Sequence, residues 1–281
     1  MSDGAHGTSR AGPEELVRDA SAEREIASWR RWLSASWASP RQYGARIAVA
    51  VAAVTVAAVP FCLLLLFVES RWGPLLEADD AARDSLHTYA LAHPMFVTLM
   101  RVTSDSGSAV AWQLVTVVVA GCLFWRRHFR LALFVIVTIA GSSLINTLVK
   151  SAAHRARPVV DHPLLHEPGK SFPSGHAQAA AAGYAVLLLI LLPYLNRVGR
   201  RVAVTIAVVM VTAIGFSRVA LAAHYVSDVL AAYVLGLAWV ALMAAAFHVW
   251  RREAIGAATK SPSGAANPPT GIGEPGEPAS E

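Results

Sequence analysis

The sequence predicts an all-α integral membrane protein, built as a bundle of six membrane-spanning helices. Hydrophobic residues make up 55% of the 281 positions and charged residues only 15%, whereas soluble domains carry about 25% charged residues. The mean hydropathy of +0.46 agrees with a membrane composition. A spanning helix needs about 20 mainly apolar residues, and six runs reach or approach that length. These runs are 47–68, 107–125, 131–149, 177–195, 202–217 and 229–250.

Each of the six runs is continuous and free of formal charge. None contains Asp, Glu, Lys or Arg between its apolar limits. Only helices and closed barrels satisfy their backbone hydrogen bonds in lipid. Barrel strands would alternate polar and apolar residues, and these runs do not. The fifth run is short, but Arg201 and Arg218 at its ends can extend their side chains to the membrane surface. We therefore expect six helices.

Arginine is concentrated in alternate connections between the runs, which predicts the orientation. Cytoplasmic loops carry an excess of Lys and Arg, so we place these connections and both termini in the cytoplasm of a multi-pass cell-membrane protein. The basic net charge of +5 then reflects topology, and we expect no nucleic-acid partner. The arginines concerned are Arg30, Arg31, Arg41, Arg46, Arg126, Arg127, Arg130, Arg197, Arg200, Arg201, Arg251 and Arg252.

The chain divides into a membrane domain, 46–252, and two cytoplasmic tails. In the first tail, 1–45, residues 13–37 form either an interfacial helix, with Trp29 and Trp37 on its apolar face, or a disordered segment. The second tail, 253–281, is rich in Pro, Gly, Ser and Ala and has too little apolar surface to fold, so we expect it to be disordered. Residues 69–106 are expected to form a long outer loop with short helices.

Three polar clusters stand at the ends of the last four runs. The first ends the third run, the second opens the fourth, and the third joins the fifth to the sixth. With six spans, all three face the extracytoplasmic side and can converge there. Cluster one is Lys150, six residues, then Arg157-Pro158; cluster two is Pro173-Ser174-Gly175-His176; cluster three is Ser217-Arg218, five residues, His224, three residues, then Asp228.

The residue types in these clusters are suited to binding a phosphate group. An Arg fork bonds two oxygens and a Lys supplies a point charge, and Arg157, Arg218 and Lys150 provide both. Ser174 is placed to cap the following helix. The N–H groups at that helix start, where Gly175 lets an anion approach the backbone, form an anion site. We therefore expect a phosphate site at these residues.

The histidines and the carboxylate are suited to nucleophilic transfer. His224 and Asp228 are four residues apart, so on a helix they share one face. A carboxylate there can orient the ring and leave the other nitrogen free to attack. His176 can protonate the leaving oxygen and later deprotonate water. Any one of these residues alone would more often be an ordinary interfacial side chain, so the interpretation depends on their combination.

At every defining position the clusters resemble the signature of the type 2 phosphatidic acid phosphatase superfamily. The resemblance covers the last four runs strongly, the first two only in topology, and neither tail. It implies a six-helix membrane fold and hydrolysis that needs no metal or cofactor, through a phosphohistidine on His224. It also implies His176 as the acid and Asp228 as the orienting residue. The implied phosphate ligands are Lys150, Arg157, Ser174, Gly175 and Arg218.

These observations predict a membrane phosphatase that hydrolyses a lipid phosphate, with that lipid and the surrounding membrane lipids as its partners. A polyprenyl (undecaprenyl) diphosphate recycled in cell-wall synthesis is the first candidate substrate. Phosphatidate, phosphatidylglycerol phosphate and diacylglycerol pyrophosphate are the alternatives. A six-helix transporter is disfavoured because no run carries a charge at its centre. An inactive lipid-binding protein is disfavoured because both histidines are present. The oligomeric state is left open.

Two further groups of side chains are candidates for ligand sites. The acidic group Glu77, Asp79, Asp80 and Asp84 is interpreted as a solvated helix face rather than a cation site. Among His154, His162 and His166, the last two have metal-ligand spacing but no matching third ligand, so we expect no metal. His154 is instead a candidate for contact with the substrate head group.

Overall fold

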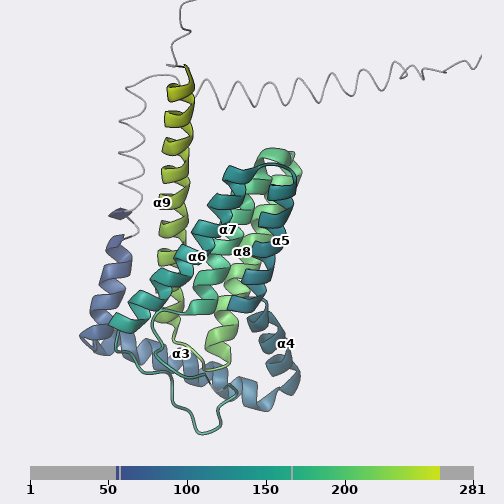
Figure 1. Cartoon of the computed structure of the whole chain (residues 1–281). Coiled ribbons are helices and arrows are strands. Elements are labelled where there is room, and N and C mark those ends of the chain that lie inside the picture. Colours follow the sequence, from purple (N-terminus) through teal and green to yellow (C-terminus); the bar gives the residue numbers. More distant parts are fainter. Residues whose placement is uncertain (1–54, 57, 166, 260–281) are drawn as a thin grey trace, which may run out of the picture. The chain divides into compact units, whose positions relative to one another are not determined.

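A computed structural model describes residues 55–56, 58–165 and 167–259. In this part of the chain every regular element is helical, as predicted (Figure 1). The predicted tail 1–45 lies outside the described residues. Helix α9 continues to Thr259, so helix covers the first residues of the predicted tail 253–281, and residues 260–281 lie outside the described part.

The helices follow one another with short connections, apart from one irregular segment between α6 and α7. The chain divides into two compact units, Met1–Ala245 and Ala246–Glu281, and the fold described below is that of the first unit. The elements are Ala58–Glu69, α3 (Gly73–Ala92), α4 (Pro94–Asp105), α5 (Ala109–Trp125), α6 (Phe129–Ala152), α7 (Gly175–Leu191), the 3-10 turn Leu192–Tyr194, α8 (Arg197–Ala220) and α9 (Val226–Thr259).

The last four predicted spans are confirmed as helices long and apolar enough to cross a membrane. Among the described residues these are Phe129–Ala152, Gly175–Tyr194, Arg197–Ala220 and Val226–Phe247. Two bent pairs, Ala58–Glu69 with α3 and α4 with α5, raise the number of candidate spans from four to at most six. The fifth predicted run, 202–217, lies within a longer helix. Helix α8 begins at Arg197, after the Asn196 cap, and ends at Ala220.

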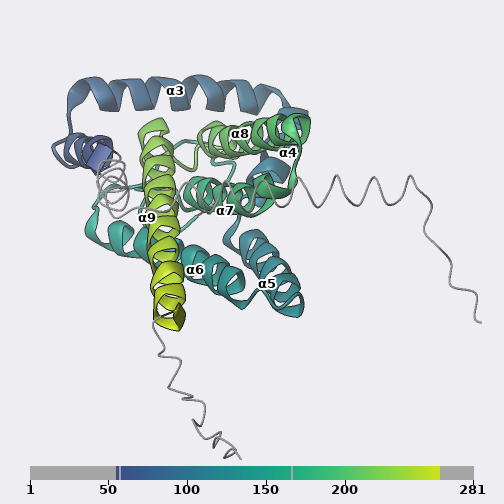
Figure 2. The same ribbon diagram turned by 90° about the horizontal axis from the view of Figure 1, so that it is seen from above.

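Residues 69–106 contain helices, as expected, but these are not the short helices of a long loop. The segment consists mainly of two substantial helices. Helix α3 has 20 residues and α4 has 12. The chain bends by 89° between Ala58–Glu69 and α3, so α3 lies across one end of the long helices (Figures 1 and 2). The His93-Pro94 step separates α3 from α4, because a residue before proline is disfavoured in helix. Helix α3 contacts α4 and α8.

Small residues let large rings enter the contacts between the long helices. Any Cβ at Gly183 of α7 would overlap the Trp112 ring of α5. Likewise, a Cβ at Gly141 of α6 would overlap Trp239 of α9, whose Nε1 donates to the Thr138 carbonyl at 2.8 Å. Ala180, Ala181 and Ala182 of the same helix are buried, as small residues at close helix contacts are.

The clusters meet because successive long helices run in opposite directions. The C-terminal ends of α6 and α8 and the N-terminal ends of α7 and α9 lie at the same end of the helices, beside α3 (Figure 1). All three polar clusters occupy these helix ends or the segments that join them.

Candidate active site

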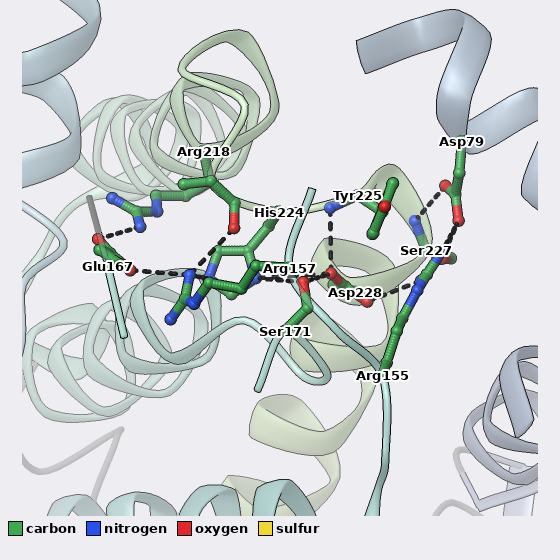
Figure 3. A network of polar contacts seen from close by, with 11 residues as sticks. Asp79, Arg155, Arg157, Glu167, Ser171, Arg218, His224, Tyr225, Ser227 and Asp228 are labelled. Atoms are coloured by element: carbon green, nitrogen blue, oxygen red, sulfur yellow. Dashed lines mark hydrogen bonds and ion pairs between the residues drawn. The ribbon is translucent and has the colours of Figure 1, made fainter. Parts of the chain in front are cut away.

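His224 lies in the tight turn between α8 and α9, not within a helix. Helix α9 begins at Val226, so the expected shared helix face is replaced by a turn that leads into the helix. The pairing is nevertheless formed, because Nδ1 of His224 lies 3.5 Å from Oδ2 of Asp228. The imidazole is only 1% exposed. On its other side, Nε2 lies 3.3 Å from Nη1 of Arg157 (Figure 3).

Burial keeps the His224 ring neutral. Desolvation outweighs the attraction of Asp228 and lowers the pKa of His224 to about 4. A neutral ring with its proton on Nδ1, toward Asp228, presents the lone pair of Nε2 toward Arg157. The tautomer follows from these partners. This arrangement suits a nucleophile.

Asp228 is fully buried in the first turn of α9 and is held by several donors. The Ser171 hydroxyl donates to Oδ2 at 2.5 Å and lies 3.4 Å from Nδ1 of His224. The Tyr225 backbone N–H also reaches Oδ2, at 3.0 Å. Nη1 of Arg155 donates to Oδ1 at 2.7 Å. These contacts set the position of the carboxylate that faces His224.

Arg155 and Asp79 are functional candidates that sequence reasoning missed. The Arg155 guanidinium bridges Asp228 and Asp79, with Nη2 2.7 Å from Oδ2 of Asp79. Asp79 also accepts the Ser227 N–H at 3.0 Å and the Ser227 hydroxyl. Burial opposes the charge of Arg155, but Asp228 and Asp79 outweigh that effect and raise its pKa. Figure 3 shows the resulting series of contacts from Asp79 of α3 to Asp228, which faces His224.

The interpretation of the acidic group as a solvated face is therefore wrong for Asp79. This residue is 2% exposed and faces the start of α9. The side chains of Asp80 and Asp84 are largely exposed, and both pair with Arg83. A charge pattern along one helix cannot separate these carboxylates, because the burial of Asp79 depends on a partner 148 positions away.

The predicted phosphate-binding arginines converge on one carboxylate, Glu167. Its Oε2 lies 2.9 Å from Nη1 of Arg157, and its Oε1 accepts from Nη2 of Arg218. Burial opposes ionisation, but the charge and hydrogen bond of Arg218, with the charge of Arg157, lower the pKa of Glu167 to about 2. Glu167 was missed as well; no spacing in the sequence relates it to the clusters.

Further donors in the same site are left without partners. Within the described part of the chain, Nε of Arg157, Nε of Arg218 and the Ser174 hydroxyl are buried and make no hydrogen bond. Buried donors are nearly always satisfied. These three belong to residues expected to bind phosphate, and each is a group that donates to an anion.

The start of α7 brings the second cluster to the site. Ser174 occupies the N-cap position, as predicted, but its side chain makes no capping bond. Its backbone N–H donates to the Asp228 carbonyl at 3.2 Å. His176 follows in the first turn of α7 and is half-buried. It lies within electrostatic range of Arg218, Glu167 and His224.

Lys150 lies in the last turn of α6 and is partly exposed. Its charge interacts with those of Arg157, Glu167, Asp228 and Arg218. The structure thus brings the predicted residues together: cations from α6, α8 and the segment between α6 and α7, a helix start, two histidines and a carboxylate. Such a set can bind a phosphate, attack it and supply a proton.

The remaining histidines contribute less. The imidazole of His154 is exposed and lies 3.9 Å from Glu69. It borders a cavity of about 440 Å³ that Tyr225 also lines. His162 is exposed, and His166 lies outside the described residues, so the spacing between them has no structural counterpart here. Among the residues described, no three His, Cys, Asp or Glu side chains form a group able to hold a metal.

Known proteins resemble this chain in sequence over the region that holds the site. A sequence profile described as the PAP2 superfamily matches residues 131–252, which contain every residue of the three clusters. Phosphatidylglycerophosphatase B of Bacillus subtilis (strain 168) is 35% identical over 139 residues, 48% of this chain and 67% of that protein. The chain belongs to the PAP2 superfamily. The resemblance seen in the sequence is confirmed.

One solved structure and one further relative are also similar to this PAP2 protein. A crystal structure described as the first transmembrane PAP2-type phosphatidylglycerolphosphate phosphatase, from Bacillus subtilis, has a TM-score of 0.63 and 28% identity, covering 70% of this chain and 96% of that one. Lipid A 1-phosphatase of Rhizobium johnstonii is 34% identical over 125 residues, 40% of this chain; the chain spans about half, 46%, of that protein. This PAP2 protein is a membrane enzyme that hydrolyses phosphoric ester bonds.

Proposed function

We propose that this PAP2 enzyme removes phosphate from a membrane lipid through a phosphohistidine on His224. One observation carries the proposal. Nε2 of the buried, neutral His224 faces Arg157 at 3.3 Å, while Nδ1 faces Asp228. A phosphate held by Arg157 and Arg218 would present its phosphorus to that nitrogen.

The reaction has two steps. In the first, the lone pair of Nε2 attacks phosphorus, the ester bond breaks, and His176 gives a proton to the departing alcohol oxygen. In the second, His176 takes a proton from water, water attacks phosphorus, and the bond to Nε2 breaks, which releases phosphate and neutral His224. Asp228 stabilises the positive charge that the His224 ring carries in between.

The charge on the phosphate is balanced by side chains and backbone. Arg157, Arg218 and Lys150 surround the site, and Ser174 and Gly175 stand at the N-terminus of α7, whose dipole favours an anion. Three cations can supply the charge stabilisation that a metal gives in other phosphatases. We therefore propose hydrolysis without a metal or cofactor.

The arginine distribution supports an orientation for this enzyme. With six spans in the cell membrane and both termini in the cytoplasm, the end of the helices that carries the site faces outward. A lipid in the outer leaflet would keep its tails in the bilayer and extend its phosphate to the site.

Two of the similar proteins support a glycerol-based substrate, whereas lipid A 1-phosphatase is named for lipid A. The Bacillus subtilis protein and the solved structure are both named for phosphatidylglycerol phosphate, which is among the alternatives expected from sequence. We propose this lipid or phosphatidate as the substrate, in place of undecaprenyl diphosphate, the first candidate from sequence.

A panel of lipid phosphates tests the proposal. Purified enzyme in lipid bilayers would be given phosphatidylglycerol phosphate, phosphatidate, diacylglycerol pyrophosphate and undecaprenyl diphosphate, and inorganic phosphate would be measured. We expect release that a chelator leaves unchanged. His224→Ala should lower kcat at least ~10³-fold. Chelator-sensitive activity, or near-normal activity in His224→Ala, would overturn the mechanism. Absence of release from every lipid would overturn the function.

A further inference from the structure

A groove with several polar residues in its lining borders the proposed phosphate site. It has a volume of about 200 Å³ and is lined mainly by α6 and α7, with the first residue of α5. His176 and Gly175 border it, so one end of the groove belongs to the phosphate site. Its polar lining residues besides His176 are Ser142, Ser143, Asn146, Thr147 and Gln178.

These polar side chains lie inside helices that are otherwise apolar. Polar groups at membrane depth are costly, and they usually mark a site or a path for a substrate. Gln178 is 1% exposed and is fixed by its neighbours. Its Nε2 donates to the carbonyl and the hydroxyl of Ser142, at 2.8 and 3.1 Å. Its Oε1 accepts from Nδ2 of Asn146 at 2.8 Å. The buried amide of Gln178 thus holds Asn146 in one orientation.

This orientation leaves acceptor and donor groups free at the groove. With Nδ2 engaged, Oδ1 of Asn146 lies 3.5 Å from the position a Cβ would take at Gly175. Within the part of the chain that the structure describes, neither Oδ1 of Asn146 nor the Ser143 hydroxyl makes a hydrogen bond. Both residues are accessible from the groove.

The position of the groove indicates which part of a substrate it meets. His176 is the group proposed to protonate the departing oxygen, so the alcohol that carries that oxygen lies on the His176 side. Apart from His176, the residues that line the groove carry no formal charge. The groove therefore matches a neutral alcohol with oxygen atoms close to the phosphate ester. A polyprenyl alcohol has only hydrocarbon there and would leave Oδ1 of the half-buried Asn146 without a donor, which is unfavourable.

We propose that this groove binds the alcohol part of the substrate and selects lipid phosphates built on glycerol or another polyol. The proposal rests on the proposed function, since it takes His176 as the acid. Asn146 would accept a hydrogen bond from a hydroxyl group next to the phosphate ester, and Ser143 would donate one to an ester or hydroxyl oxygen. Gln178 would act through Asn146, as a positioning residue.

The test compares three substrates in wild type and in groove variants. The substrates are phosphatidylglycerol phosphate, undecaprenyl phosphate, and water-soluble p-nitrophenyl phosphate, which reports on the reacting centre alone. Asn146→Leu should lower kcat/KM for phosphatidylglycerol phosphate about 10-fold or more, and Ser143→Ala about 3-fold. Neither should lower kcat/KM for undecaprenyl phosphate. The matched control is Gln113→Leu, which makes the same amide-to-leucine change on the exposed face of α5.

Each outcome decides the matter. Wild type that prefers undecaprenyl phosphate, or groove variants that lose activity equally on both lipids, would overturn the proposed selection while leaving the phosphatase function intact. If Asn146→Leu also loses hydrolysis of p-nitrophenyl phosphate, that substitution has disturbed the reacting centre. The milder Ser143→Ala variant then tests the proposed selection between the two lipids. Wild type that hydrolyses none of the three substrates would overturn the proposed function and the groove together.

Discussion

At the residue scale, the site combines a neutral histidine with an excess of positive charge. His224 is buried beside Arg157, and both burial and the cations disfavour its protonation. Asp228 favours protonation, but it is itself paired with Arg155. The result is a ring that stays unprotonated well below the pH at which an exposed histidine would become charged. A nucleophile of this kind is available over a broad pH range.

The first prediction concerns the acid limb of activity. In the proposed mechanism His224 attacks as the neutral ring. Its pKa is lowered from 6.5 to about 4, so kcat/KM should hold on acidification until pH approaches 4. The measurement is kcat/KM for p-nitrophenyl phosphate from pH 3.5 to 8. An acid limb near pH 6.5 would contradict a buried, desolvated nucleophile.

The same lowered pKa predicts the pH dependence of stability. Between pH 6.5 and 4 the unfolded chain binds a proton at His224 that the folded protein does not. The free energy of unfolding therefore rises with pH in this window, and the His224 contribution is lost as pH falls through it. Thermal unfolding in detergent at pH 4.5 and 7.5 should show a smaller pH difference in His224→Asn than in wild type. An equal difference in both proteins would refute the assignment.

A third residue-scale prediction follows from Glu167. Its carboxylate binds the same Arg157 and Arg218 forks that a phosphate needs, so it competes with the substrate and with product phosphate. Glu167→Gln should lower the inhibition constant of inorganic phosphate about 10-fold, since a charge-assisted hydrogen bond contributes about 1.5–3 kcal/mol. The control is Asp161→Asn, an exposed carboxylate of the same segment. Weaker phosphate inhibition in Glu167→Gln would instead assign this carboxylate to holding the arginines in place.

At the element scale, α3 is the part whose role differs most from expectation. It is a helix that crosses the end of the long helices, and it carries Asp79 inward to Arg155 and Ser227. Arg155 spans the distance to Asp228 because its planar fork offers separate donors to two carboxylates. A helix outside the three clusters thereby supports the geometry of the catalytic pair.

The prediction at this scale is that Asp79 acts through Arg155 on Asp228. Asp79→Asn should lower kcat about 10-fold with little change in KM, because groups that position an active-site residue typically account for 10–100-fold effects. It should also shift the acid limb of the pH profile. Arg155→Lys, which keeps the charge and loses the fork, should lower kcat similarly. Kinetics indistinguishable from those of Asp84→Asn, an exposed carboxylate on the same helix, would contradict this role.

At the scale of the whole molecule, antiparallel order of the long helices gathers the site at one end. Four helices qualify as spans on their own among the described residues, and two bent pairs can add two more. The arginine-rich connections between the helices lie at the end opposite the site. Since cytoplasmic loops carry an excess of arginine, we expect the site to face away from the cytoplasm.

Cysteine labelling tests that orientation. After replacement of Cys62 and Cys122 by alanine, Asp161→Cys reports on the end that carries the site and His128→Cys on the connection between α5 and α6. In intact cells, an impermeant thiol reagent should label the Asp161 position and reach the His128 position only after permeabilisation. The reverse pattern would place the site in the cytoplasm.

Much of this organisation could be predicted from the sequence, and the failures have a common cause. The last four spans and the convergence of the clusters follow from local patterns of hydropathy and spacing. Ser171, Arg155, Asp79 and Glu167 do not, since each acquires its role through contacts between distant segments. Ser171, for example, meets Asp228 across 57 positions of the chain.

The sequence by itself determined the membrane class and the family, and it supplied the residues that we propose to react. Apolar runs long enough for a bilayer and a fixed set of cations, histidines and a carboxylate can be recognised one position at a time. Only the tertiary structure decided how those residues are held: Asp79 with Arg155 behind Asp228, Glu167 between the arginines, and a polar groove beside His176. The physical reason is that a buried charge or amide is tolerated only where partners from other segments pair with it.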